Sequence, residues 1–326
     1  MRIVFMGTPE FAVPSLKALV EGGYSVVGVV TQPDRPKGRG KKLAMSPVKE
    51  YAIQQGIPVL QPERISRDGY EDLLNLHPDL CVTAAFGQIL SQKILDIPPL
   101  GTINVHASLL PKHRGSAPIA WAMVQGDKTT GVTTMMTARG IDNGDMLLKA
   151  ETPIDPAETC GELTARLSEI GAKLLIDTLK ALENGTLERI PQDESQMTYD
   201  PKLEKDMGVI DWTQDAADIV HRIHGLNPWP GCTSAAPGGT WKLLRAEVAD
   251  MSGQPGEVLA ADGKEGLIVA AGKNAVRVCQ LQVPGGKPMD ARDYLRGHAM
   301  AAGTMLKEDT DCLLYTSPSP RDVEES

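Results

Sequence analysis

An amide and an imidazole stand two residues apart at the end of one short predicted strand. The segment 102–106 alternates, so Ile103 and Val105 share one face while Asn104 and His106 share the other. In an open α/β sheet, ligands bind at the carboxyl edge of the strands. Both polar side chains could donate hydrogen bonds to an oxygen that becomes negative during a reaction. The alternative is that they only satisfy the backbone of the following loop.

A second polar segment, residues 140–147 (GIDNGDML), places two carboxylates in a turn between apolar strands. These are Asp142 and Asp145. A histidine and an aspartate on neighbouring strand ends can pair, and the carboxylate then orients the ring and favours its protonated form. One charged ring and one amide, both hydrogen-bond donors, would suit a developing oxyanion.

Five segments together resemble the methionyl-tRNA formyltransferases, which use 10-formyltetrahydrofolate. The resemblance covers residues 1 to about 306 and is carried by MRIVFMGTPEFAVPSL, TQPDRPKGRGKKL, AAFGQIL, INVHASLLPKHRG and GIDNGDML. Two positions depart from the family pattern, since Asn143 stands where threonine is usual and Phe86 where tyrosine is usual. Neither change removes a proton-transfer group.

The resemblance implies that Asn104, His106 and Asp142 are catalytic. The α-amine of an aminoacyl-tRNA attacks the formyl carbon, while Asn104 and protonated His106 donate hydrogen bonds to the resulting oxyanion. Asp142 accepts from the His106 ring, directly or through a water, and raises its pKa. The donor is 10-formyltetrahydrofolate as a co-substrate, and no metal is expected because the formyl group is already activated.

The resemblance also implies two stretches that contact the folate. One stretch is the loop after the catalytic strand, formed by Ser108, Leu109, Leu110 and Pro111. The other follows an earlier strand and is formed by Phe86, Gly87, Gln88, Ile89 and Leu90. For Gly87 a simple backbone turn is the default explanation. Two residues follow this loop. Arg114 could bind a carboxylate or phosphate, or it could brace the loop. His113 is expected to be exposed and dispensable.

A basic loop lies between residues 33 and 43. Five of the eight residues from 35 to 42 are basic and none is acidic. Its prolines and glycines argue against a regular helix or strand. Such a loop can follow a polyanion, although an ordinary solvated loop is the alternative. The resemblance implies that it meets the acceptor end of tRNA. The expected tRNA-binding residues are Arg35, Lys37, Arg39, Lys41 and Lys42.

The predicted fold class is α/β, with two folded domains. Strand, helix and strand within about 30 residues form a βαβ unit, so residues 1–185 are expected to form a catalytic domain with a Rossmann-like open parallel sheet. Residues 186–205 lack an apolar period and are interpreted as a linker. Short β-rich runs in 206–307 suggest a small barrel, and the resemblance implies an OB-like tRNA-binding domain. Residues 308–326 are interpreted as a non-native disordered tail.

Composition excludes several classes of protein. No apolar run approaches the ~18 residues of a membrane span, and the first residues are typical of a strand, which favours a cytoplasmic protein. Five scattered cysteines without a C-x-x-C pair indicate neither disulfides nor a zinc site. His221 and His224 are expected on a solvated helix face. Residues 308–326 contribute −5 to the net charge of −9, so the remainder is mildly acidic and RNA binding stays possible.

The expected partners are initiator Met-tRNA and folate, with no protein partner and a monomeric state. Four rivals remain open. Glycinamide ribonucleotide formyltransferases share the catalytic set but only the first domain, and UDP-amino-sugar formyltransferases have little use for the basic loop. A formyltetrahydrofolate hydrolase would release formate without an amine. An RNA-binding module on an inactive scaffold would leave the catalytic residues unexplained.

Overall fold

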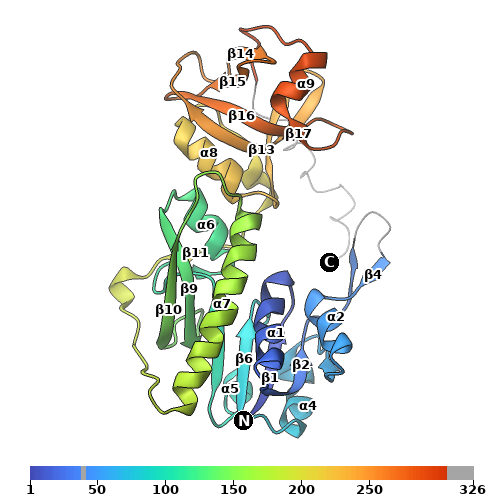
Figure 1. The fold of residues 1–326 in the computed structure, drawn as a ribbon, viewed down its shortest axis with the longest axis vertical. Helices are drawn as coiled ribbons and strands as arrows, with labels where there is room; N and C mark the ends of the chain where they lie inside the picture. Colours follow the sequence, from blue (N-terminus) through green and yellow to red (C-terminus); the bar gives the residue numbers. More distant parts are fainter. Residues whose placement is uncertain (38–41, 307–326) are drawn as a thin grey trace, which may run out of the picture. The chain divides into compact units, whose positions relative to one another are not determined.

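The computed structural model describes residues 1–37 and 42–306 (Figure 1). Contacts within the chain divide it into two units. Unit 1 consists of residues 1–119, 129–153 and 162–201, and unit 2 consists of residues 120–128, 154–161 and the chain from residue 202 onward. The residues 308–326 that were interpreted as a foreign tail lie outside the described residues.

Unit 1 is built on a mixed sheet with strand order β10-β9-β7-β6-β1-β2-β5 among the described residues. The strands are β1 (Arg2–Gly7), β2 (Ser25–Val30), β5 (Val59–Leu60), β6 (Leu80–Ala84), β7 (Thr102–His106), β9 (Thr129–Met136) and β10 (Met146–Pro153). Neighbours from β5 to β7 are parallel, whereas β9 is antiparallel to both β7 and β10. The parallel-sheet prediction therefore fails at β9 and β10. The loop 137–145 between these two strands is too short for the crossover that parallel neighbours need, whereas β9 runs antiparallel to β7 even though the connection between them contains α6.

Helices cover both faces of this sheet. They are η1 (Glu10–Ala12), α1 (Val13–Glu21), α2 (Pro47–Gln54), α3 (Ile65–Asp68), α4 (Tyr70–Asn75), α5 (Gln92–Leu95), α6 (Pro118–Val124), which continues into unit 2, and α7 (Cys160–Glu183). Helix α2 starts where the sequence predicts, because the Ser46 hydroxyl accepts a hydrogen bond from the Lys49 N–H and Pro47 occupies the first turn.

Strand β7, which carries Asn104 and His106, has one face turned to α7 and the other to the candidate site. Helix α7 lies along the sheet in Figure 1, and a Cβ at Gly171 of α7 would lie 2.9 Å from Val105 Cγ1. Glycine at 171 thus allows the helix to approach β7 closely. Thr83 of β6 is opposite Asn104 in the parallel register, so both lie on the face away from α7.

Unit 2 carries a second, antiparallel sheet with strand order β12-β13-β16-β15-β14, and β17 pairs with β16. Its elements are η3 (Lys205–Gly208), α8 (Ala216–Gly225), β12 (Cys232–Ala236), β13 (Gly239–Ala249), β14 (Val258–Asp262), β15 (Gly266–Ala270), β16 (Ala275–Gln282), β17 (Met289–Asp290) and α9 (Ala291–Gly297). Within the described residues β12 and β14 do not pair, so the sheet does not close into a barrel.

The longest helix of unit 1, α7, is amphipathic and buries one apolar face. Helix α7 buries Leu163, Leu167, Leu174 and Leu175 at helical spacing, while charged residues such as Glu169, Lys173 and Lys180 lie outside this buried stripe. In the described part of the chain, no helix combines the length and the apolar character that crossing a membrane requires.

Candidate active site

Asn104 lies on β7 with its amide nitrogen available as a donor. The Thr83 hydroxyl on β6 donates a hydrogen bond of 2.9 Å to Asn104 Oδ1. This contact fixes the orientation of the carboxamide, so its NH₂ group points away from Thr83. Among the described residues, that NH₂ group has no hydrogen-bond partner. The sequence predicted such a donor at the end of this strand.

His106 is two residues further along β7 and only 6% exposed. Its Nε2 atom lies 2.9 Å from the backbone oxygen of His113. Because a carbonyl oxygen can only accept a hydrogen bond, Nε2 carries the hydrogen. The other nitrogen, Nδ1, faces Asp142, and its distance to Asp142 Oδ1 is 3.7 Å. Nδ1 is therefore the nitrogen that is directed into the candidate site.

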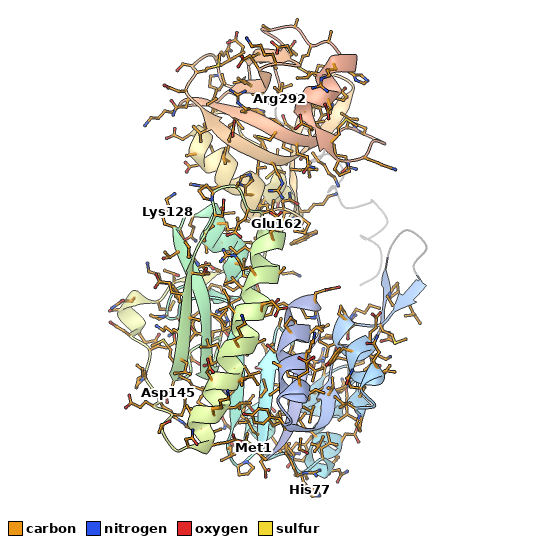
Figure 2. The ribbon with its side chains drawn as sticks, viewed as in Figure 1. Met1, His77, Lys128, Asp145, Glu162 and Arg292 are labelled. Carbon is orange, nitrogen blue, oxygen red and sulfur yellow. The ribbon has the colours of Figure 1, made fainter. Side chains whose placement is uncertain are left out.

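Asp142 comes from the loop between β9 and β10 and stands in the left-handed region with φ +49°. Its Oδ2 accepts a hydrogen bond of 2.9 Å from the Gly115 N–H. The 3.7 Å separation from His106 exceeds hydrogen-bond length, so the two groups interact as an ion pair when the ring is protonated. Asp145 lies at the beginning of β10 (Figure 2), and its carbonyl accepts from the Met136 N–H.

The loop 108–111 after β7 is held by hydrogen bonds within unit 1. Ser108 donates from its hydroxyl to the Lys112 carbonyl, and its own carbonyl accepts from the Thr133 hydroxyl. The Leu110 N–H donates to the Thr133 hydroxyl, and the Leu110 carbonyl accepts from Lys149 Nζ at 2.5 Å. Leu109 and Pro111 are half-buried. The loop is thus preorganised around the end of β7.

The second stretch expected at the folate, residues 86–90, divides between core and surface. Phe86 is buried in a core cluster that also contains Met6, and Leu90 packs against this cluster. The Gln88 carboxamide accepts from the Ile65 N–H and donates to the Pro62 carbonyl. Ile89 is 87% exposed. Gly87 has φ +80°, which agrees with the backbone-turn explanation.

The segment 186–205 does more than connect the units, and its contribution could not be read from the sequence. Gln192 donates from its amide to the carbonyls of Asp142 and Gly144, at 2.7 and 2.8 Å. Arg114 donates to Gln192 Oε1 and to the Glu194 carboxylate. Arg114 thus combines both predicted roles, because it binds the Glu194 carboxylate through two hydrogen bonds and braces the Asp142 loop through Gln192. Hydrogen bonds from Arg114 also lower the pKa of Glu194.

The expectation that His113 is exposed is wrong. It is 5% exposed, and its Nδ1 lies 2.8 Å from Asp200 Oδ2. Asp200 belongs to β11 (Tyr199–Asp200), which pairs in parallel with β8 (Arg114–Gly115). A basic loop next to a proline normally lies at the surface, but the parallel pairing of β11 with β8 encloses this one.

The basic loop begins and ends as a small hairpin. Strand β3 (Arg35–Lys37) is antiparallel to β4 (Lys42–Ala44), with Pro36 opposite Leu43. This contradicts the expectation that no strand forms here, because a two-stranded ribbon has free edges on which proline needs no donor. The Arg35 side chain is exposed. Arg39 and Lys41 lie outside the described residues, and Lys37 and Lys42 are located by their backbone.

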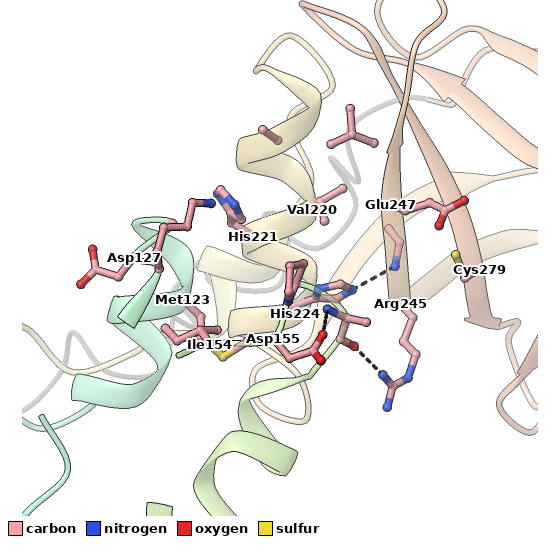
Figure 3. A pocket seen from close by; sticks show the side chains of 17 residues that line it. Met123, Asp127, Ile154, Asp155, Val220, His221, His224, Arg245, Glu247 and Cys279 are labelled. Carbon is pink, nitrogen blue, oxygen red and sulfur yellow. Dashed lines mark hydrogen bonds between the residues drawn. The ribbon is translucent and has the colours of Figure 1, made fainter. Parts of the chain in front are cut away.

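A cavity of about 500 Å³ lies within unit 2 and contains none of the predicted site residues (Figure 3). His224 of α8 lines it, and its Nε2 accepts from the Ala246 N–H at 3.2 Å. His224 is buried, so the prediction of a solvated helix face is wrong for this residue. Arg245 donates to the Ala157 carbonyl. Among the described residues, no group of three or more potential ligands is arranged to hold a metal ion.

Two family models match this chain in succession. The model described as formyl transferase matches residues 1–179, and the model described as formyl transferase, C-terminal domain, matches residues 202–299. The chain belongs to the formyl transferase family. Within this formyl transferase, the first match contains Asn104, His106 and Asp142, and the second contains the antiparallel sheet.

Full-length relatives are similar over almost the entire chain. A methionyl-tRNA formyltransferase of Acetivibrio thermocellus is 49% identical over 310 residues, which cover 94% of this chain and 99% of that protein. A methionyl-tRNA formyltransferase of Caldanaerobacter subterraneus subsp. tengcongensis is 49% identical over 311 residues, covering 94% and 100%.

Solved structures share the fold at lower identity. An N-formyltransferase from Helicobacter canadensis, in complex with folinic acid and dTDP-3-aminofucose, has a TM-score of 0.66 at 17% identity and covers 85% of this chain and 98% of its own. HypX from Aquifex aeolicus, in complex with tetrahydrofolic acid, has a TM-score of 0.59 at 21% identity and covers 90% of this chain and 47% of its own.

Proposed function

We propose that this protein transfers a formyl group from 10-formyltetrahydrofolate to the α-amine of initiator methionyl-tRNA, for translation initiation. The observation that carries the proposal is the arrangement on β7, where the Asn104 amide and the His106–Asp142 pair stand together in a chain that belongs to the formyl transferase family. Relatives of the same length and 49% identity carry the name of this activity.

The donor set fits a carbonyl oxygen that gains negative charge. The Asn104 NH₂ group and His106 Nδ1–H supply two hydrogen-bond donors, and hydrogen bonds to Thr83 and His113 hold both side chains in place. The C–N bond to the attacking amine forms as the formyl C–N bond to the folate breaks, and Asp142, 3.7 Å from Nδ1, would act with the His106 ring to relay the amine's proton to the departing folate nitrogen. The folate donor supplies an activated formyl group, so the residues have to orient, stabilise and transfer a proton.

We assign folate binding to residues on both sides of the catalytic strand end. The proposed contacts are Ser108, Leu109, Leu110, Pro111, Phe86, Gly87, Gln88, Ile89 and Leu90. The preorganised loop 108–111 and the exposure of Ile89 support this assignment. Buried Phe86 would contribute through its shape and its backbone.

We assign tRNA binding to the basic hairpin and to the second domain. The proposed hairpin contacts are Arg35, Lys37, Arg39, Lys41 and Lys42. Residues 1–185 would be the catalytic domain, 186–205 the connection and 206–307 an OB-like tRNA-binding domain. The separate antiparallel sheet of unit 2 supports the last assignment. We further propose a cytoplasmic monomer, since translation uses both substrates there and one chain supplies Asn104, His106 and Asp142.

The decisive experiment incubates the full chain with labelled 10-formyltetrahydrofolate and charged initiator tRNA. We expect labelled formyl-methionyl-tRNA, and much less product with elongator methionyl-tRNA. Formate released without any amine would instead identify a hydrolase. Transfer to an amino sugar nucleotide, with none to tRNA, would contradict the assigned acceptor.

A further inference from the structure

A buried contact between a histidine and an aspartate lies directly behind the catalytic imidazole. His113 Nδ1 and Asp200 Oδ2 are 2.8 Å apart, and the two residues are 5% and 1% exposed. They are brought together by the parallel pairing of β8 with β11, in which Asp200 is opposite Gly115. Neither side chain has a role in the reaction proposed above.

The backbone of this buried stretch holds both catalytic partners. The His113 carbonyl accepts the hydrogen of His106 Nε2 at 2.9 Å. Two residues later, the Gly115 N–H donates to Asp142 Oδ2, also at 2.9 Å. Residues 113–115 therefore supply one fixed acceptor for the imidazole and one fixed donor for the carboxylate.

We propose that His113 and Asp200 are positioning residues that set the orientation of His106 and Asp142. Asp200 holds the His113 ring, and this fixes the backbone of residues 113–115. The His113 carbonyl then keeps the hydrogen of His106 on Nε2, so Nδ1 is the nitrogen that faces Asp142 and the reacting carbonyl. The proposal rests on the proposed function, because it names residues that serve the same site.

The backbone at 113 needs such support because it is strained. His113 has φ +59°, a conformation that costs a non-glycine residue about 1–3 kcal/mol and persists only where its surroundings determine it. Besides the ring contact, the His113 N–H donates to Thr198 Oγ1 at 2.7 Å, and the Arg114 N–H donates to the Thr198 carbonyl at 3.0 Å. The segment 198–200 thus acts as a template for residues 113–115.

Close approach of the two strands strengthens this template. A Cβ at Gly115 would lie 2.2 Å from the Asp200 carbonyl oxygen, so only glycine allows β11 to pack here. Gly115 has φ +120°, which also favours glycine. Gly115, which donates to Asp142, therefore packs directly against Asp200, which also contacts His113.

Stability alone does not explain a polar pair at this position. A buried charged or hydrogen-bonded pair gives little net stability compared with apolar residues of similar volume, because both groups lose their hydration. The pair acts on the orientation of His106 and Asp142, since a displacement of about 1 Å in a catalytic group can lower a rate by about 100-fold.

The test compares Asp200→Ala and Asp200→Asn with the unmodified chain. We expect Asp200→Ala to lower kcat on the order of 10- to 100-fold, with KM for the folate donor within about twofold, and we expect Asp200→Asn to recover part of the loss because its amide oxygen can accept from His113. Asp193→Ala is the matched control, since Asp193 caps the exposed helix η2 (Glu194–Gln196) in the same segment.

Nitrogen-15 NMR of the imidazoles provides a readout that does not depend on activity. The chain has six histidines, and His106→Gln assigns the signal of interest. We expect neutral His106 to carry its hydrogen on Nε2 in the unmodified chain, and a mixture of both tautomers in Asp200→Ala. If Asp200→Ala does not fold, Thr198→Val weakens the same template and should give the same direction of change.

The two proposals fail in different ways. A folded Asp200→Ala protein with unchanged kcat and an unchanged His106 tautomer would overturn the positioning role. An unmodified chain that shows the Nε2–H tautomer but does not transfer formyl to methionyl-tRNA would overturn the proposed function and leave the positioning geometry intact.

Discussion

We expect the proposed chemistry to depend on three side chains, those of Asn104, His106 and Asp142, whose roles can be separated by conservative changes. His106→Ala removes a donor to the developing oxyanion and should lower kcat by about 100- to 1000-fold, equivalent to about 2.7–4 kcal/mol. Asp142→Asn keeps an acceptor for the Gly115 N–H and tolerates the left-handed backbone, but it removes the charge. Steady-state kinetics should therefore show a large loss in kcat with KM for folate changed by less than about threefold.

The neighbouring carboxylate supplies the control. Asp145→Asn leaves the His106–Asp142 contact in place and should retain most of the activity. A variant of His106 or Asp142 with a raised KM and an intact kcat would show that these residues bind substrate equally in the ground and transition states.

Some of these residues could be found from the sequence and others could not. Strand alternation places Asn104 and His106 on one face, and the family resemblance selects Asp142 over Asp145. No comparable pattern marks Gln192 or Asp200, because both lie in a stretch without apolar periodicity and reach partners far away in the sequence. Asp200 reaches His113 through the tertiary pairing of β11 with β8, and Gln192 reaches the Asp142 loop by lying against Arg114.

Among the elements, the basic hairpin β3–β4 offers a test of nucleic-acid binding. Each lysine or arginine that contacts a phosphate adds about 0.9 to the slope of log affinity against log salt concentration. We expect Arg35→Gln and Arg39→Gln each to raise KM for methionyl-tRNA and to reduce this slope by about 1, without changing KM for folate. Tritiated-tRNA filter binding across a salt series measures the slope.

An arginine elsewhere on unit 1 serves as the matched control. Arg67 is exposed and paired with Asp68 at 2.5 Å, so Arg67→Gln removes the same charge outside the hairpin. If it reduced the salt slope as much as Arg35→Gln, the effect would come from total charge and the hairpin would have no special role.

The same hairpin shows the limit of local sequence rules. Proline and glycine argue against regular structure, and this is sound for central strands. Among the described residues, the two short strands form a ribbon by themselves, so no further described strand needs the donor that proline lacks. Glycine and proline content alone could not distinguish such a ribbon from an irregular loop.

For the whole molecule, the sequence predicts architecture better than it predicts closure of the sheets. Before residue 107, the alternation of strands and helices correctly indicates parallel β-α units. The helices that connect parallel strands can be recognised in the sequence by their amphipathic pattern. The reversal at β9 and the open edges of β12 and β14 depend on which strands pair. Strand pairing is a long-range property that composition and periodicity do not specify.

The ionisation of one carboxyl group, that of Asp34, predicts how the stability of the fold changes with pH. Hydrogen bonds from Lys49 and Gln61 lower the pKa of Asp34. A carboxyl group with a lower pKa in the folded state stabilises the fold above its unfolded pKa of about 3.9, and this contribution is lost as the pH falls through the folded value. Asp34→Asn should therefore melt below the unmodified chain at pH 7, and the difference between the two melting temperatures should shrink as the pH falls below about 3.9. Thermal melts across this range provide the measurement, and a difference that stayed constant with pH would mean that packing, and not ionisation, gives Asp34 its effect.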